Sequence, residues 1–298
     1  MSVSVSAQFP TRRRYGYVRL LLVILSFLQT SACSISRRNE SPNNTVLVLG
    51  SLHSWMLDHP HYTLPVFVDA IERFRPDVIL TEVRPEQPGP VDGSIDGGIE
   101  QALVYAIGEL RGVPVVAVDW FDDAYIAAIM AEQAVSRPVL ESAQAPLRQT
   151  YQQVLASGTF EAMQSAETSA IVHKLYDLFD QFGSGVYTTR NRRICQNVVS
   201  RLSELHGKRV LIVFGLDHKY FLDDCVAQAG NHLAEAPAAS GTKPLSADIR
   251  ERALLHVRDS KTALQERLAN GVYSKIYAER LTNKVPSFDR WIDRLSSD

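Results

Sequence analysis

The chain contains four short runs of apolar residues, at positions 45–49, 77–81, 113–118 and 209–214. Apolar residues dominate these runs without alternating with polar ones, which is typical of parallel strands buried on both faces. The stretches between them carry apolar residues at helical spacing, as in Phe67, Ile71 and Phe74. The pattern predicts an α/β fold with a mostly parallel central sheet and helices on both faces.

No strand pattern appears between residues 122 and 182, where Ala, Gln and Leu recur with helical spacing. We predict that this stretch is a helical cap inserted into an α/β domain at 45–233. We also predict a linker at 234–245 and a helical C-terminal segment at 246–298. This segment is expected to be a pair of helices packed on the domain. The glycine- and proline-rich stretch at 85–98 is expected to be a loop, long enough to form a lid or rim.

The N-terminal 33 residues have the pattern of an export signal. Arg12-Arg13-Arg14 precedes an apolar run at 20–28 and the small residues Ser31-Ala32, which stand before Cys33. The apolar run is shorter than the roughly 18 residues that span a bilayer, so a signal peptide is predicted. Cys33 resembles the acylated cysteine of bacterial lipoproteins, with ordinary secretion and an uncleaved anchor as alternatives.

This leader also predicts the location of the protein. Lipidation at Cys33, followed by a polar tether at 34–44, would make the membrane a partner through the N-terminal lipid. By the same resemblance, Ser34 favours the outer membrane, so we expect the cell envelope and its periplasmic face.

Composition and charge exclude some partners. The formal net charge of −2 gives no basic footprint for nucleic acid, and the oligomeric state is left open. Export would permit a disulfide between Cys195 and Cys225, but two separate cysteines on packed helices are the favoured interpretation. No Cys-x-x-Cys pair indicates zinc bound through cysteine.

A Gly-x-x-His motif follows two of the predicted strands. It ends at His53 after the first strand and at His218 after the fourth, while Glu82 and Asp119 follow the second and third. Parallel strands have their carboxyl ends at one edge of the sheet, where open α/β sheets bind ligands. The four side chains are therefore expected to converge on one site.

Two imidazoles and two carboxylates suit two kinds of chemistry. They match the ligands of a divalent metal such as zinc or manganese, and they equally suit metal-free acid–base catalysis. Arg84, two residues past Glu82, and Arg190, at the start of the helix before the fourth strand, could neutralise a carboxylate or hold an anionic substrate or intermediate. The predicted metal ligands are His53, His218, Glu82 and Asp119.

Four segments, at 48–53, 76–84, 189–191 and 213–218, resemble the ordered motifs of the TraB/GumN/Tiki superfamily, which includes erythromycin-esterase-like and ChaN-like proteins. The resemblance implies an α/β core and, in the Tiki branch, a metal-dependent protease. His53 and His218 would then be metal ligands, and Glu82 a ligand or the general base. Arg84 and Arg190 would support the carboxylate or stabilise a tetrahedral intermediate.

Three functions follow from these observations. The leading hypothesis is a membrane-anchored, metal-dependent hydrolase that cleaves a peptide or ester bond in a peptide or small molecule. In the esterase-like branch the same His and Glu residues would activate water without a metal. The alternative is a ChaN-like lipoprotein that binds haem without catalysis and without a Cys-x-x-Cys-His attachment. The third is an interaction lipoprotein that has lost its chemistry. Gly-x-Ser-x-Gly, P-loop and His-Glu-x-x-His motifs are absent from the sequence.

Overall fold

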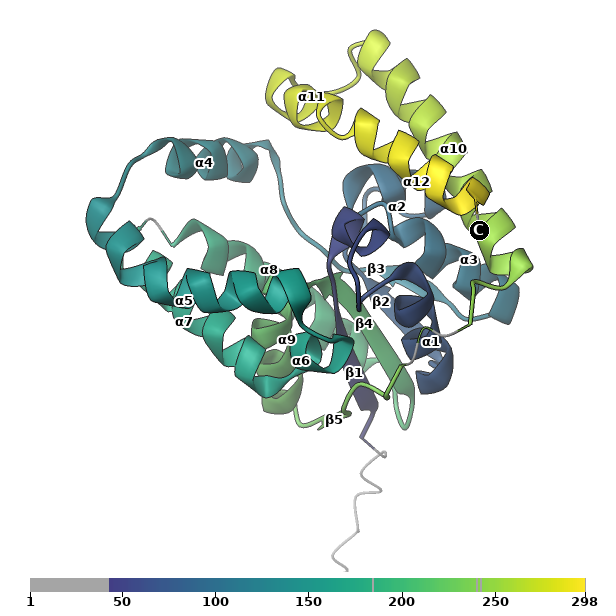
Figure 1. Cartoon of the computed structure of the whole chain (residues 1–298), viewed down its shortest axis with the longest axis horizontal. Coiled ribbons are helices and arrows are strands. Elements are labelled where there is room, and N and C mark those ends of the chain that lie inside the picture. The colour runs from purple at the N-terminus through teal and green to yellow at the C-terminus, as the bar shows by residue number, and fades with distance from the viewer. Residues whose placement is uncertain (1–42, 184, 240, 242, 298) are drawn as a thin grey trace, which may run out of the picture. The chain divides into compact units, whose positions relative to one another are not determined.

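The computed structural model describes residues 43–183, 185–239, 241 and 243–297 (Figure 1). Its centre is a parallel sheet in the order β3-β2-β4-β1-β5. The strands are β1 (Thr45–Ser51), β2 (Val78–Thr81), β3 (Val115–Ala117), β4 (Arg209–Gly215) and β5 (His232–Leu233). The predicted α/β fold with a parallel sheet is confirmed. The signal peptide, Cys33 and nearly all of the tether lie outside the described residues.

The edge strand β5 is not indicated by the apolar pattern. It has only two residues, both exposed, and it forms where His232 and Leu233 pair with Thr45 and Val46 of β1. Such a short strand depends on its neighbour in the sheet for its existence. A sequence pattern with a period of two has nothing to detect at that length.

Successive residues of the central strands point to opposite faces of the sheet. Leu47 and Leu49 belong to a core shared with α1 (Leu64–Phe74) and α3 (Gln101–Arg111). Val46 and Val48 belong to a second core shared with α8 (Val186–Ser203) and α9 (Leu216–Gln228). Helices therefore cover both faces, which explains why the strands are apolar throughout.

The stretch at 85–98 is not wholly the loop that its glycine and proline content predicts. It contains the helix α2 (Pro90–Asp96), which begins at a proline in the first turn, where the missing N–H costs nothing. Ser94 and Ile95 are buried, and α2 contacts α3 and the C-terminal helix α10 (Ala247–Ala269). These tertiary contacts stabilise a helix that local propensity disfavours.

The region at 122–182 is helical, as expected for a cap. Its helices are α4 (Asp123–Ala134), α5 (Pro138–Ser157), α6 (Phe160–Gln164) and α7 (Ala166–Phe182). The buried Gln164 side chain bonds both backbone groups of Gly50, accepting from its N–H at 2.9 Å and donating to its carbonyl at 2.8 Å. The cap is thus attached directly to the first Gly-x-x-His motif.

The C-terminal segment forms three helices instead of the expected pair: α10 (Ala247–Ala269), α11 (Lys275–Thr282) and α12 (Val285–Ser297). The extra helix α11 begins at Ser274, whose side chain accepts a hydrogen bond from the Tyr277 N–H. Phe288 and Trp291 of α12 are fully buried in the core that contains α1. The segment is therefore part of the main core.

Cys195 of α8 and Cys225 of α9 form a disulfide, so the prediction of two separate cysteines is wrong. The two helices pack side by side on one face of the sheet, which brings the Cα atoms to 5.9 Å. The spacing of thirty residues does not reveal this orientation. Across the described part of the chain, no helix combines the length and apolar character needed to cross a membrane.

Candidate functional site

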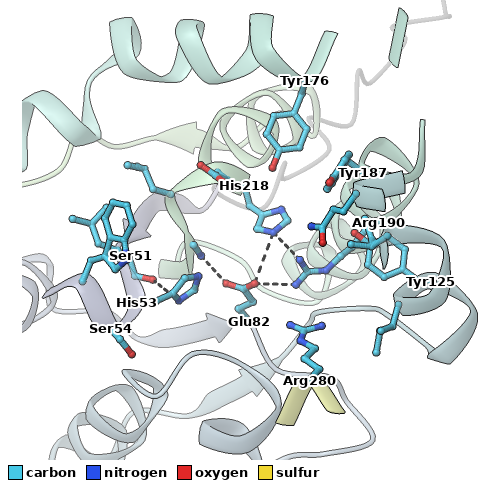
Figure 2. A pocket seen from close by; sticks show the side chains of 18 of the residues that line it. Ser51, His53, Ser54, Glu82, Tyr125, Tyr176, Tyr187, Arg190, His218 and Arg280 are labelled. Atoms are coloured by element: carbon cyan, nitrogen blue, oxygen red, sulfur yellow. Dashed lines mark hydrogen bonds and ion pairs between the residues drawn. The ribbon is translucent and has the colours of Figure 1, made fainter. Parts of the chain in front are cut away.

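The polar residues that follow the strands meet at one edge of the sheet. His53 begins the short 3-10 helix η1 (His53–Leu57) after β1, Glu82 directly follows β2, and His218 lies in the first turn of α9 after β4. They line a cavity of about 810 Å³, together with residues of the cap and of α11. Figure 2 shows His53, Glu82, Arg190 and His218 grouped at the centre of this cavity.

The glycines of the two motifs allow this close approach. A Cβ atom added to Gly215 would lie 2.6 Å from His53 Nε2 and 3.4 Å from Glu82 Oε2. A Cβ atom added to Gly50 would lie 2.5 Å from Cδ1 and 3.0 Å from Cα of Leu216. Each motif therefore needs glycine because the other motif passes within van der Waals contact of it.

His53 forms an ion pair with Glu100, a residue that was not predicted because it does not follow a strand. Its Nδ1 lies 2.7 Å from Oε1 of Glu100, which also accepts a hydrogen bond from the Ser51 hydroxyl at 2.8 Å. The Glu100 side chain is fully buried, whereas 47% of the His53 side chain is exposed. Glu100 lies at the start of α3, shortly after Gly97-Gly98, and it does not follow a strand. No pattern in the sequence therefore pointed to it.

The charge of Glu100 controls the ionisation of His53. Desolvation lowers the pKa of His53, but the attraction and hydrogen bond of Glu100 outweigh it and raise this pKa to about 9. Burial raises the pKa of Glu100, and His53 and Ser51 reverse that effect, so the net pKa is lowered. The pair is thus an imidazolium and a carboxylate at neutral pH.

Arg190 lies among the other predicted site residues. Its Nη2 donates to Glu82 Oε1 at 2.9 Å and to Asp119 Oδ2 at 2.7 Å, and its Nε donates to Asp119 Oδ1 at 3.2 Å. Its Nη1 donates to His218 Nε2 at 2.8 Å. Because a guanidinium only donates, His218 Nε2 accepts, and Nδ1 carries the hydrogen that is donated to Asn191 Oδ1 at 2.6 Å.

This network fixes the charges of its members. Burial and the Arg190 cation lower the pKa of His218 to about 3, so its imidazole is neutral. Burial raises the pKa of Glu82, but the Arg190 cation, the His53 imidazolium and the Gly215 N–H outweigh it and lower this pKa to about 2. The Gly215 N–H donates to Glu82 Oε2 at 2.6 Å. Glu82 is therefore a carboxylate held from both sides.

Arg84 is not part of this network. Its Nε and Nη2 donate to Asp96 Oδ1 at 2.9 Å and 2.6 Å, and its guanidinium lies 4.3 Å from the ring centroid of Phe121. The Tyr277 hydroxyl donates to the same Asp96 oxygen at 2.8 Å. Arg84 thus joins the end of β2 to α2 and α11, and its hydrogen bonds within the described segments go to Asp96 and the Phe121 carbonyl instead of Glu82.

The predicted metal ligands do not have the arrangement of a metal site. Among residues 43–297 apart from the undescribed positions, no group of three or more His, Cys, Asp or Glu side chains could hold a metal ion. Glu82, Asp119 and His218 all direct acceptor atoms at the Arg190 cation, which lies where a metal would need to bind. The donor set does not fit zinc or manganese, and no catalytic step is derived through either.

The cap, α8 and the C-terminal segment contribute further cavity residues. These residues do not follow strands, so the sequence pattern did not predict them. Tyr125 of α4, Tyr176 of α7 and Tyr187 of α8 line one side, and Arg280 of α11 lines another. Asn191 directly follows Arg190 and orients His218. Their positions depend on how separate helices pack over the sheet edge, which no local spacing encodes.

Comparison with known proteins identifies no relative: no family model, no curated protein and no solved structure matches the chain. The resemblance to the TraB/GumN/Tiki superfamily stays a prediction based on short motifs.

Proposed function

We propose that the protein is a hydrolase that cleaves a peptide or ester bond, with His53 as the general base. The observation that carries this proposal is the His53–Glu100 pair, in which a buried carboxylate bonds Nδ1 and leaves Nε2 beside the cavity. A base that is oriented by a third group is the arrangement that activates a nucleophile in hydrolases. Here the nucleophile would be water, since the Ser51 hydroxyl lies on the Nδ1 side of His53 and no described serine or cysteine is hydrogen-bonded to Nε2.

The reaction follows from the positions of the charges. His53 Nε2 and Glu82 Oε2 both approach Gly215, and a water between them can give its proton to Nε2 while its oxygen attacks the substrate carbonyl. Glu100 stabilises the imidazolium that forms. The same proton then passes from Nε2 to the leaving nitrogen or oxygen, which restores neutral His53 and releases two products.

Arg190 supports the negative charge that develops on the substrate oxygen. The described contacts use four of its five N–H groups, which leaves one Nη1 hydrogen for the oxyanion. Asp119 and His218 hold the guanidinium in place, and Asn191 holds His218. These three are positioning residues in the proposal, because Arg190 lies between them and the reacting atoms.

Hydrolysis assays with ester and peptide panels test this function. We expect His53→Ala and Arg190→Lys to lose hydrolysis while Arg201→Gln, on the exposed end of α8, keeps it. Equal rates in the wild type and His53→Ala would reject the proposal. Elemental analysis of the same samples tests the sequence-based expectation of zinc or manganese, which the proposed mechanism does not use.

We also propose that the protein is anchored through Cys33 on the periplasmic face of the outer membrane. The Cys195–Cys225 disulfide supports export, because disulfides persist mainly in oxidising compartments. Metabolic labelling with a fatty acid is expected to mark the wild type and not Cys33→Ser. Labelling of both proteins would reject the acylation site.

Haem binding is the second candidate, favoured by the tyrosine hydroxyls at the cavity. Those of Tyr176 and Tyr187 have no hydrogen-bond partner among the described residues, and tyrosine is a known axial ligand of haem iron. Both nitrogens of His218 are already bonded, so His218 is not available for that role. Haem titration with a Soret shift lost in Tyr176→Phe or Tyr187→Phe would support this function, and a flat titration would remove it.

A further inference from the structure

The cap helices α4 and α7, together with α8 and η1, give the cavity an aromatic wall. The rings of Tyr176 and Tyr187 pack edge to face with centroids 5.6 Å apart, and Tyr125 and the exposed Trp55 line the same cavity. Burial raises the pKa values of Tyr125 and Tyr176, so these hydroxyls stay neutral. Such a wall offers ring faces and neutral hydrogen-bond donors to a ligand, and it suits an aromatic or apolar group.

The C-terminal segment gives the cavity a cationic wall. Arg280 of α11 is exposed, lies 5.3 Å from the ring centroid of Phe121 and forms no ion pair with a carboxylate in the described part of the chain. Lys284, four residues further on, donates to the Ile95 carbonyl at 2.7 Å. Figure 2 shows Arg280 and Tyr176 on opposite sides of the Glu82–Arg190–His218 network.

Two hollows meet at the proposed catalytic residues. The cavity of about 810 Å³ contains the tyrosines, and a second one of about 300 Å³ lies toward Lys284. His53, Glu82, Arg190 and Arg280 line both. A ligand that occupies both hollows therefore passes across His53, with different chemistry at its two ends.

We propose that the site binds an amphipathic carboxylate, with an aromatic or apolar group against the tyrosines of the aromatic wall and a carboxylate on Arg280. As a substrate it would be an N-acyl amino acid or a peptide C-terminus, whose scissile bond lies between the two groups at His53. The position of the scissile bond rests on the proposed hydrolase. The binding of this ligand class does not.

The charges of the site favour a carboxylate over a phosphate. Glu82 and Asp119 share the cation Arg190, so Arg190 alone does not neutralise the Glu82 carboxylate at the edge of the second hollow, and Lys284 on its far side donates to a backbone carbonyl instead. The Glu82 carboxylate repels a dianion more strongly than a monoanion. Arg280 lies over Phe121 and lines both hollows, so its guanidinium can form a paired, charge-assisted hydrogen bond with a carboxylate.

Isothermal titration of the full chain at neutral pH tests the proposal with four probes: N-benzoylglycine, its neutral amide, N-acetylglycine and phenyl phosphate. We expect N-benzoylglycine to bind about tenfold or more tightly than each of the others, the size typical of one charge-assisted contact. Arg280→Gln should abolish the preference for the acid over the amide and leave the affinity of the amide unchanged. Arg201→Gln is the matched control and should keep the preference.

The proposal is overturned by no detectable binding of N-benzoylglycine, by equal affinity for the acid and its amide, or by an unchanged preference in Arg280→Gln. Tighter binding of phenyl phosphate would reject the carboxylate as the anionic group. If the binding pattern holds but no ester or amide is hydrolysed, the ligand class stands and the proposed hydrolase fails. The two proposals are thus separated by one set of samples.

Discussion

At the scale of single residues, His53 has an unusual backbone conformation. Its φ of 51° lies in the left-handed region, and Arg75 is the other non-glycine residue with positive φ in the described segments. Arg75 ends α1, where this conformation is common, but His53 begins η1 directly after a strand. The Glu100 ion pair offsets the strain of this conformation. The conformation places Nε2 next to Gly215, across the edge of the sheet. Strained backbone of this kind is concentrated at functional sites, which agrees with the role proposed for His53.

The pKa of His53 leads to a prediction about pH. A general base must be deprotonated, and Glu100 raises the pKa of His53 to about 9, so kcat/KM should increase with pH and level off above about pH 9. Glu100→Gln removes the negative charge, which lowers this pKa and should move the midpoint to lower pH. Rate profiles of both proteins measure this shift. A rate that falls as His53 deprotonates would instead make His53 a general acid.

The two motif glycines give a matched pair of variants. In Gly215→Ala the new Cβ meets the end of the His53 ring, so we expect a normal melting temperature but a loss of activity of about 100-fold, the usual effect of a displaced catalytic group. In Gly50→Ala the new Cβ meets the Leu216 backbone, so we expect a lower melting temperature. Activity assays and thermal melts of both variants test this. Full activity in Gly215→Ala would show that the reaction does not need His53 at its present position.

Much of the fold and part of the site could be predicted at the scale of elements. Buried parallel strands are recognisable because they lack polar alternation, and their shared direction places His53, Glu82 and His218 at one edge. Glu100 could not be found this way, because it reaches the site from the start of a helix. Arg84 has the correct spacing beside Glu82, but its partner Asp96 lies on a helix that the glycine and proline content conceals.

The C-terminal helices are expected to be essential for stability. Trp291 of α12 is fully buried and its Nε1 donates to the Ser54 hydroxyl at 3.1 Å, so Trp291→Ala should lower the free energy of unfolding by about 3–5 kcal/mol. Val272 is 64% exposed, and Val272→Ala should change this free energy by less than about 0.5 kcal/mol. Urea denaturation measures both. Similar stabilities of the two variants would mean that the segment docks only loosely on the core.

At the scale of the whole molecule, the disulfide joins α8, which contains Arg190, to α9, which contains its hydrogen-bond partner His218. Arg190 lies on α8 five residues before Cys195, and His218 lies on α9 seven residues before Cys225. The cross-link restricts the unfolded chain, so Cys195→Ser/Cys225→Ser should lose roughly 2–4 kcal/mol of stability. It also limits sliding of α8 against α9, so activity should fall more than the folded fraction does at the same temperature. Assays at temperatures where the variant is fully folded separate the two effects, and full activity there would assign the disulfide to stability alone.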